Sequence, residues 1–154
     1  MTRLMTIVEE PRGETYSRLL QFALKKNSLF SLVWREEFDF DTSAMSLEET
    51  LRSDLLSKRR TGEWPGTRLF GSLAVLRLYR MSGVTLATLG EAGGLYEWEA
   101  PARPEDLAFY MDENTPWLGS IAHERDAFVY SGAVDLQELS VDVPALRLEF
   151  VSDS

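Results

Sequence analysis

His123 is the single histidine of the chain, and histidine is the side chain best suited to proton transfer or metal binding near neutral pH. If residues 117–124 form a strand, neighbouring side chains point to opposite faces. Ser120 and His123 then cannot form a nucleophilic pair, and His123 and Glu124 cannot hold one metal ion together. An enzyme that uses His123 needs a carboxylate from elsewhere in the chain. His123 is thus the one catalytic candidate, against the alternative of a hydrogen-bonded structural histidine, and we predict no metal site and no cofactor.

The other chemistry-bearing motifs have simpler interpretations. Glu37, Asp39 and Asp41 share one face of a predicted strand, where they can hold Mg²⁺ or act as an acid–base pair, or form a solvated strand end. The sequence contains no nucleophile elbow, phosphate loop or dinucleotide fingerprint. It also has no cysteine, which excludes disulfides and thiolate chemistry.

Charge is divided unevenly along the chain. Residues 1–90 contain 13 Lys/Arg and 11 Asp/Glu, a net charge of +2, whereas residues 91–154 contain 3 Arg and 14 Asp/Glu, a net charge of −11. The acidic half repels phosphate backbones, so we expect no nucleic-acid binding there. It attracts a basic protein partner, with plain solubility as the alternative.

Two tryptophans are flanked by carboxylates and are candidate anchors for such a partner. Both lie in or near loops, where they are either partly exposed or cover the edge of the core, and the core edge is favoured for Trp98. Two further carboxylates follow Pro104, where they join the same surface or cap a turn. The predicted binding residues are Trp64, Glu97, Trp98, Glu99, Glu105 and Asp106.

Hydrophobic periodicity predicts the elements that position these residues. Apolar side chains at helical spacing favour helices over 14–26 and 47–60, the second opening on a capping box at Ser46 and ending at the basic run Lys58-Arg59-Arg60. Alternating or continuous apolar runs favour strands over 29–40, 70–80, 106–111, 117–124 and 127–130, with weaker signals at 96–99 and 146–150. Residues 84–89 fit a helix or a strand.

These elements predict a single α+β domain over residues 1–154. Because most strands follow one another in hairpin order after two helices, we expect an antiparallel sheet of about five to six strands with two N-terminal helices packed on one face. No apolar run is long enough to cross a bilayer, and no signal peptide is visible, so we expect a cytoplasmic protein with no membrane partner. Whether it is a monomer or a homodimer is left open.

Two motifs resemble a group of small uncharacterised bacterial proteins. They are the run Pro104-Glu105-Asp106-Leu107-Ala108-Phe109-Tyr110 and the run Ser120-Ile121-Ala122-His123-Glu124, with Glu63-Trp64-Pro65-Gly66-Thr67 as a third point of likeness. Some members of that group are labelled "stage III sporulation protein AH". The resemblance covers roughly residues 14–127. It implies a shared fold and a role in recognising another protein, and no catalytic residue.

Two functional hypotheses follow from these observations. The first is a protein-binding module of the bacterial cytoplasm, for example an immunity-type protein that neutralises a basic toxin through an acidic face. The second is an enzyme of unknown class that uses His123 with a nearby carboxylate. Binding that weakens with salt favours the first, and a cavity that contains His123 favours the second.

Overall fold

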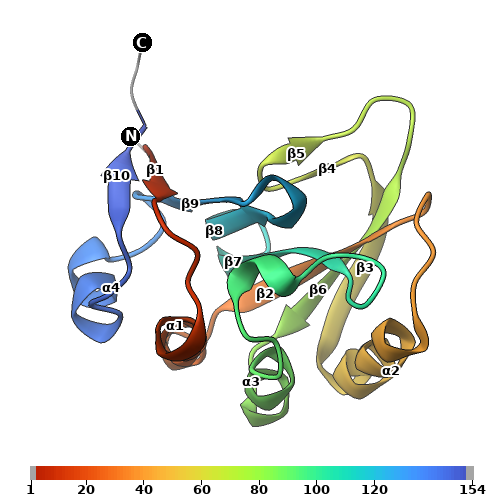
Figure 1. The fold of residues 1–154 in the computed structure, drawn as a ribbon, viewed down its shortest axis with the longest axis horizontal. Coiled ribbons are helices and arrows are strands. Elements are labelled where there is room, and N and C mark those ends of the chain that lie inside the picture. Colours follow the sequence, from red (N-terminus) through yellow and green to blue (C-terminus); the bar gives the residue numbers. More distant parts are fainter. Residues whose placement is uncertain (1–2, 152–154) are drawn as a thin grey trace.

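The computed structural model describes residues 3–151 as an α+β fold built on an eight-stranded sheet (Figure 1). Every strand pair in this sheet is antiparallel. In sheet order the strands are β10 (Leu148–Phe150), β1 (Leu4–Ile7), β9 (Asp126–Tyr130), β8 (Thr115–Ile121), β7 (Glu105–Asp112), β2 (Leu29–Arg35), β6 (Ala74–Arg80) and β3 (Leu55–Thr61). The α+β class is confirmed, but the expectation of five to six strands is wrong.

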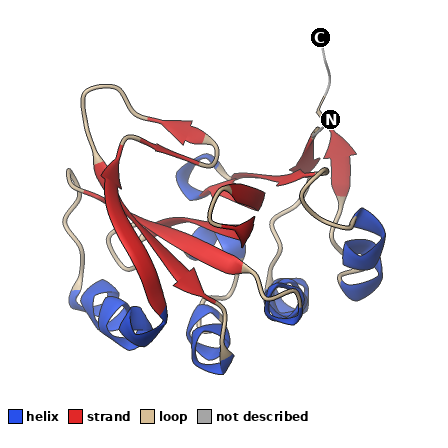
Figure 2. Cartoon of the chain, turned by 180° about the vertical axis from the view of Figure 1, so that it is seen from behind, coloured by secondary structure: helices blue, strands red, loops and turns tan. Residues whose placement is uncertain are grey.

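Helices cover one face of the sheet, and a small hairpin covers part of the other (Figures 1 and 2). The described α-helices are α1 (Gly13–Lys25), α2 (Thr42–Leu51), α3 (Gly83–Leu89) and α4 (Leu136–Asp142), and the hairpin consists of β4 (Glu63–Trp64) and β5 (Thr67–Arg68). Single 3₁₀ turns are η1 (Arg52–Asp54), η2 (Leu95–Glu97) and η3 (Ala122–Glu124). The prediction of two N-terminal helices alone is wrong, because α3 and α4 come later in the chain.

The predicted second helix, over 47–60, is the largest local error. The helix begins at Thr42 and ends at Leu51, and the basic run Lys58-Arg59-Arg60 lies on β3, paired with β6. Local leucine spacing suits a helix, but the pairing of a whole strand with β6 outweighs that propensity. The run is exposed at the edge of the sheet, where charged side chains discourage further strand pairing.

Several predicted strands are shorter than expected, and their ends become the loops that matter for function. The strand predicted over 29–40 ends at Arg35, and the one over 117–124 ends at Ile121. The strand over 70–80 begins at Ala74, residues 95–97 form a 3₁₀ turn, and residues 84–89 are helical. The strands predicted over 106–111 and 117–124 are found as the β7–β8 hairpin, with its turn at residues 112–114.

The sheet has a core on each face. The larger core lies between the helices and the sheet and includes Leu19, Phe30 and Phe109. The smaller core lies under the β4–β5 hairpin, where Trp64 packs on Val33 and Leu76. None of the helices among residues 3–151 is long and apolar enough to cross a membrane.

Candidate functional site

Two buried carboxylates lie side by side at the start of β7. Glu105 is 4% exposed and Asp106 is 1% exposed. The pairing of β7 with β2 shifts register here, from Ser31↔Ala108 to Val33↔Glu105, so that β7 carries an extra residue. Asp106 has a φ of 52°, in the left-handed region that a non-glycine residue rarely adopts. Such a bulge re-aims side chains, and backbone strain of this kind is concentrated at functional sites.

Asp106 is fixed by two hydrogen bonds from different parts of the fold. Its Oδ2 accepts from Trp64 Nε1 at 3.0 Å, and its Oδ1 accepts from the backbone N–H of Ala122 at 3.0 Å. Ala122 begins η3, the turn that carries His123. Asp106 therefore ties the start of β7 both to the β4–β5 hairpin and to the histidine turn.

Glu105 differs from Asp106 because one of its oxygens has no partner. Its Oε2 is buried and makes no hydrogen bond. Burial, reinforced by the negative charge of Asp106, raises the pKa of Glu105 to about 7, against smaller opposing effects of a hydrogen bond from the Ala100 backbone and of the Arg35 cation. Burial also raises the pKa of Asp106, and the hydrogen bond from Trp64 opposes this shift.

His123 completes the cluster. One of its ring nitrogens and one carboxylate oxygen from each of Glu105 and Asp106 lie within 4.8 Å of one another. His123 is exposed, whereas both acids are buried. An enzyme that uses His123 needs a carboxylate from elsewhere in the chain, and the pairing of β7 with β8 brings two such carboxylates from β7 close to His123.

A cavity of about 400 Å³ opens over Glu105 and His123. Its other walls come from the loop after β2 and from the segment before β7. The lining residues are Glu37, Phe38, Asp39, Glu99, Ala100, Pro101, Glu105 and His123. They include four carboxylates and no Lys or Arg. The nearest described cation that faces the acids is Arg35, whose Nη1 lies 3.6 Å from Glu37 Oε1.

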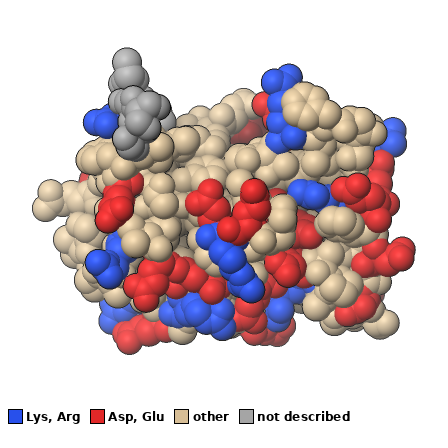
Figure 3. Space-filling view, turned by 45° about the horizontal axis from the view of Figure 1, so that its top comes forward, with Lys and Arg blue, Asp and Glu red and all other residues tan. Residues whose placement is uncertain are grey.

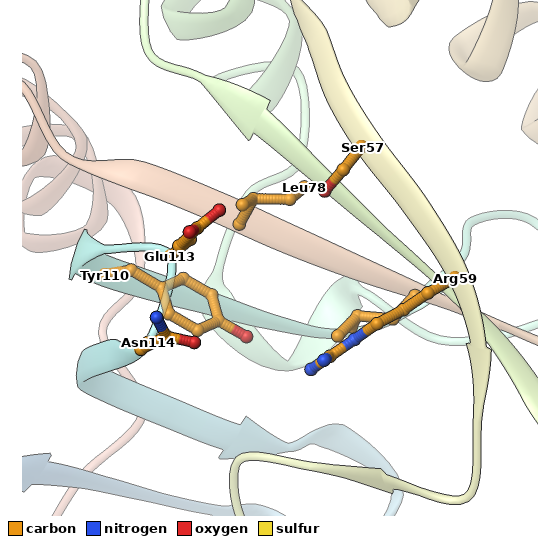
Figure 4. Close-up of a pocket in the computed structure, with 7 residues that line it drawn as sticks. Ser57, Arg59, Leu78, Tyr110, Glu113 and Asn114 are labelled. Carbon is orange, nitrogen blue, oxygen red and sulfur yellow. The ribbon is translucent and has the colours of Figure 1, made fainter.

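A second hollow, of about 270 Å³, lies on the sheet face that carries the β4–β5 hairpin (Figure 4). Arg59 of β3 and Tyr110 of β7 face it from opposite sides, with Glu113 and Asn114 of the β7–β8 turn. The Tyr110 hydroxyl already has a partner, since it lies 2.8 Å from Ser31 Oγ in a hydrogen bond. The buried side-chain atoms that lack partners belong to Trp34, Arg35, Arg77, Tyr79 and Glu105, and none of these residues lines this hollow. The cavity over Glu105 is therefore the better candidate site.

Both tryptophans are buried, so of the two positions left open for each ring the exposed one is not found. Trp64 is 5% exposed and Trp98 is 0% exposed. Trp98 lies in the main core and donates from Nε1 to the Tyr16 hydroxyl at 2.9 Å, because an apolar ring of that size is stabilised more by burial than by a position among carboxylates. Trp64 faces inward, toward Asp106. Neither ring is presented to a partner in this conformation.

Three acidic residues of the second half, Glu97, Glu138 and Asp142, pair with cations from the first half among the described residues. Glu97 accepts from Arg12 at 3.0 Å, and Glu138 pairs with Lys25 and Lys26 at 3.2 and 2.7 Å. On the face drawn in Figure 3, basic side chains lie among the acidic ones. Among the predicted binding residues, Glu99, Glu105 and Asp106 converge on the cavity region, whereas Glu97 lies in an exposed ion pair.

The sequence contained a signal for this cluster that motif searching did not use. The β7–β8 hairpin pairs Phe109 with Leu118. Extending that register toward the open end of the hairpin brings Glu105 opposite Ala122, next to His123. The left-handed Asp106 and the loop that brings Glu37 and Asp39 to the cavity had no comparable signal.

Comparison with protein-family models, with curated proteins and with solved structures finds no match to this chain. The resemblance carried by the Pro104 and Ser120 motifs therefore stays a prediction. The chemistry of the site follows from its own residues.

Proposed function

We propose that the chain is a metal-dependent enzyme, with a divalent transition-metal ion bound between Glu105, Asp106 and His123. The observation that carries this proposal is the buried, unpartnered Oε2 of Glu105, a residue that lines the same cavity as His123 and belongs to the same three-residue cluster. A buried polar atom without a partner costs about 1–3 kcal/mol, and more for a charged group. A bound cation removes that cost.

The donor set indicates the kind of metal. An imidazole with two carboxylates suits zinc and neighbouring first-row ions better than Mg²⁺ or Ca²⁺, which take oxygen ligands. Ligands bonded to zinc at about 2.0–2.2 Å lie about 3.5 Å apart, somewhat closer than the 4.8 Å spread of the cluster. His123 is the exposed member and closes this difference by a small movement of its ring.

The surroundings support a catalytic rather than a closed structural site. Three protein ligands leave a coordination position open, and here the cavity lies above it. The hydrogen bonds from Trp64 and Ala122 orient Asp106 as outer-shell partners orient metal ligands. An ion held by Glu105, Asp106 and His123 would supply an acidified water for attack on a carbonyl or related centre, which is the chemistry of metal-assisted hydrolysis.

Calorimetric titration of the metal-free protein with Zn²⁺ tests the proposal. We expect one ion per chain, and an affinity loss of at least about 100-fold in His123→Ala, because the variant removes a ligand. Glu124→Gln is the matched control, since it alters the neighbouring exposed residue and leaves the three ligands in place. Equal zinc affinity in wild type and His123→Ala would refute the proposal.

A protein-binding module for a basic partner is the second candidate. It loses its tryptophan anchors, but Asp39 and Glu99 at the cavity are carboxylates without an ion pair among the described residues. An immunity-type function of this kind predicts that a lysine-rich peptide binds in the presence of a chelator and is released by salt. Binding that requires zinc favours the enzyme instead.

A further inference from the structure

We infer that the ligand of this cavity carries a cationic end group, an alkyl guanidinium or ammonium, held by Glu37, Asp39 and Glu99. The inference rests on the proposed function, because it names the substrate class of the same site. Its own observations are the three carboxylates on the cavity wall and the apolar surface beside them, and it shares with the proposed function the buried Glu105 that lines the same cavity.

The wall carboxylates are available to a ligand. Asp39 and Glu99 make no side-chain hydrogen bond or ion pair with any described residue, and the contact of Glu37 with Arg35 is long, at 3.6 Å. Arg35 itself is 12% exposed at its side chain and lies 5.3 Å from the Phe38 ring centroid, behind the cavity wall. No described Lys or Arg lines the cavity, so Asp39 and Glu99 have no cation that a ligand must displace.

The shape of the wall matches the stem of a basic side chain. Phe38, Ala100 and Pro101 contribute apolar surface beside the carboxylates, and Phe38 is 36% exposed. Long cationic side chains lay their methylene groups on such surface and keep the charged head among polar groups. An aromatic face next to that head adds a cation–π contact. A cavity of about 400 Å³ is within the range of small-ligand sites.

The unpartnered Oε2 of Glu105 shows that the wall is more than a solvated acidic patch. Glu105 is 4% exposed and lines the same cavity, so the cavity leads from Asp39 and Glu99 to the carboxylate that is assigned above to the metal ion. An acidic patch alone would leave all its carboxylates satisfied by water. The buried floor gives the entering ligand a defined inner end.

The negative charge of the cavity wall excludes anionic substrates. A divalent ion offsets the charges of Glu105 and Asp106. Glu37, Asp39 and Glu99 then remain, and Arg35 compensates for one of them. Such a surface repels phosphate and carboxylate ligands and attracts cations.

The test compares two isosteric probes, N-acetyl-arginine amide and N-acetyl-citrulline amide, which differ in one charge. We expect the arginine probe to bind the zinc-loaded protein at least about tenfold tighter than the citrulline probe. The double variant Asp39→Asn with Glu99→Gln is expected to lose about tenfold in affinity for the arginine probe and to keep its zinc affinity. Equal binding of the two probes, or an unchanged affinity in the double variant, would overturn the inference.

Two further ligands distinguish the source of the cation. An arginine-containing pentapeptide that binds tighter than agmatine identifies a protein side chain as the source of the cation. The reverse order identifies a free amine, and either order supports the inference.

Zinc titration separates this inference from the proposed function. Loss of zinc binding in Glu105→Gln without loss in the double variant assigns metal and cation to different residues. Arginine binding by a wild-type protein that takes no zinc would refute the metal site alone.

Discussion

Glu48 of α2 and Glu105 of β7 are both enclosed carboxylates, but only Glu48 has strong cationic partners. Glu48 accepts a hydrogen bond from Arg52 Nη2 at 2.8 Å and another from Arg77. These bonds, that of Arg52 first, lower the pKa of Glu48, whereas burial raises the pKa of Glu105 to about 7. Glu48 is thus a carboxylate whose surroundings stabilise its charge in the folded chain.

The difference does not arise from a lack of cations near Glu105. Arg35 lies close enough to influence Glu105, yet its ion pair is with Glu37. The fold therefore gives hydrogen-bond partners to Glu48, which connects α2 to the sheet, and leaves one oxygen of Glu105 without a partner at a cavity. An unpartnered carboxylate near a histidine suits a metal ligand, whereas a carboxylate paired with two arginines stabilises the fold.

The largest expected effect concerns the support of Asp106. Trp64→Phe keeps most of the buried ring but removes the hydrogen bond to Oδ2, so zinc affinity should fall by about 10-fold to 100-fold. Trp98→Phe is the matched control, because it removes a comparable buried bond, to Tyr16, outside the cluster. Competition with a chromophoric chelator measures both. Parallel losses in the two variants would mean that Trp64 acts through general stability.

The second prediction is that the substitution of glutamate by glutamine changes the free energy of unfolding in opposite directions at positions 48 and 105. Glu48→Gln should lower the free energy of unfolding by about 1–2 kcal/mol, since two arginines lose a charged partner. Glu105→Gln in the metal-free protein should raise it by about 1 kcal/mol, because an unpartnered buried charge is removed. Urea denaturation at neutral pH measures both. Destabilisation of equal size at the two positions would remove the contrast.

The smallest expected effect is the acid dependence of the Glu48 pairing. The folded-state pKa of Glu48 is lowered from its ordinary value of 4.5, so its contribution is present above that value and lost as pH falls through the folded pKa. Wild type should therefore lose more stability than Glu48→Gln between neutral pH and about pH 3. Parallel stability curves for the two proteins would contradict this.

Local sequence patterns correctly predicted helix α1 and the β7–β8 hairpin, whose formation depends mainly on neighbouring residues. The apolar face of α1 and the β7–β8 hairpin follow directly from periodicity and from the turn at residues 112–114. The basic run after Leu51 misled the prediction, because helix-end chemistry and edge-strand chemistry both favour exposed Lys and Arg. Only the partner strand, β6, decides between them, and strand pairing is a long-range property.

The candidate site was predictable only in part, for a similar reason. His123 stood out by type, and Glu99, Glu105 and Asp106 by charge, but their adjacency depends on sheet register. The charged neighbours of Trp64 and Trp98 left both an exposed and a core-edge position open. Burial of an indole ring is decided by the packing around it, and that packing is invisible in the flanking residues.

Anomalous scattering at the zinc edge, from crystals of the zinc-loaded protein, tests the ligand role of Glu105 most directly. The account predicts one strong peak within about 2.2 Å of a carboxylate oxygen of Glu105, of Asp106 and of a ring nitrogen of His123. A zinc peak on other residues, with Glu105 Oε2 still unpartnered, would contradict it.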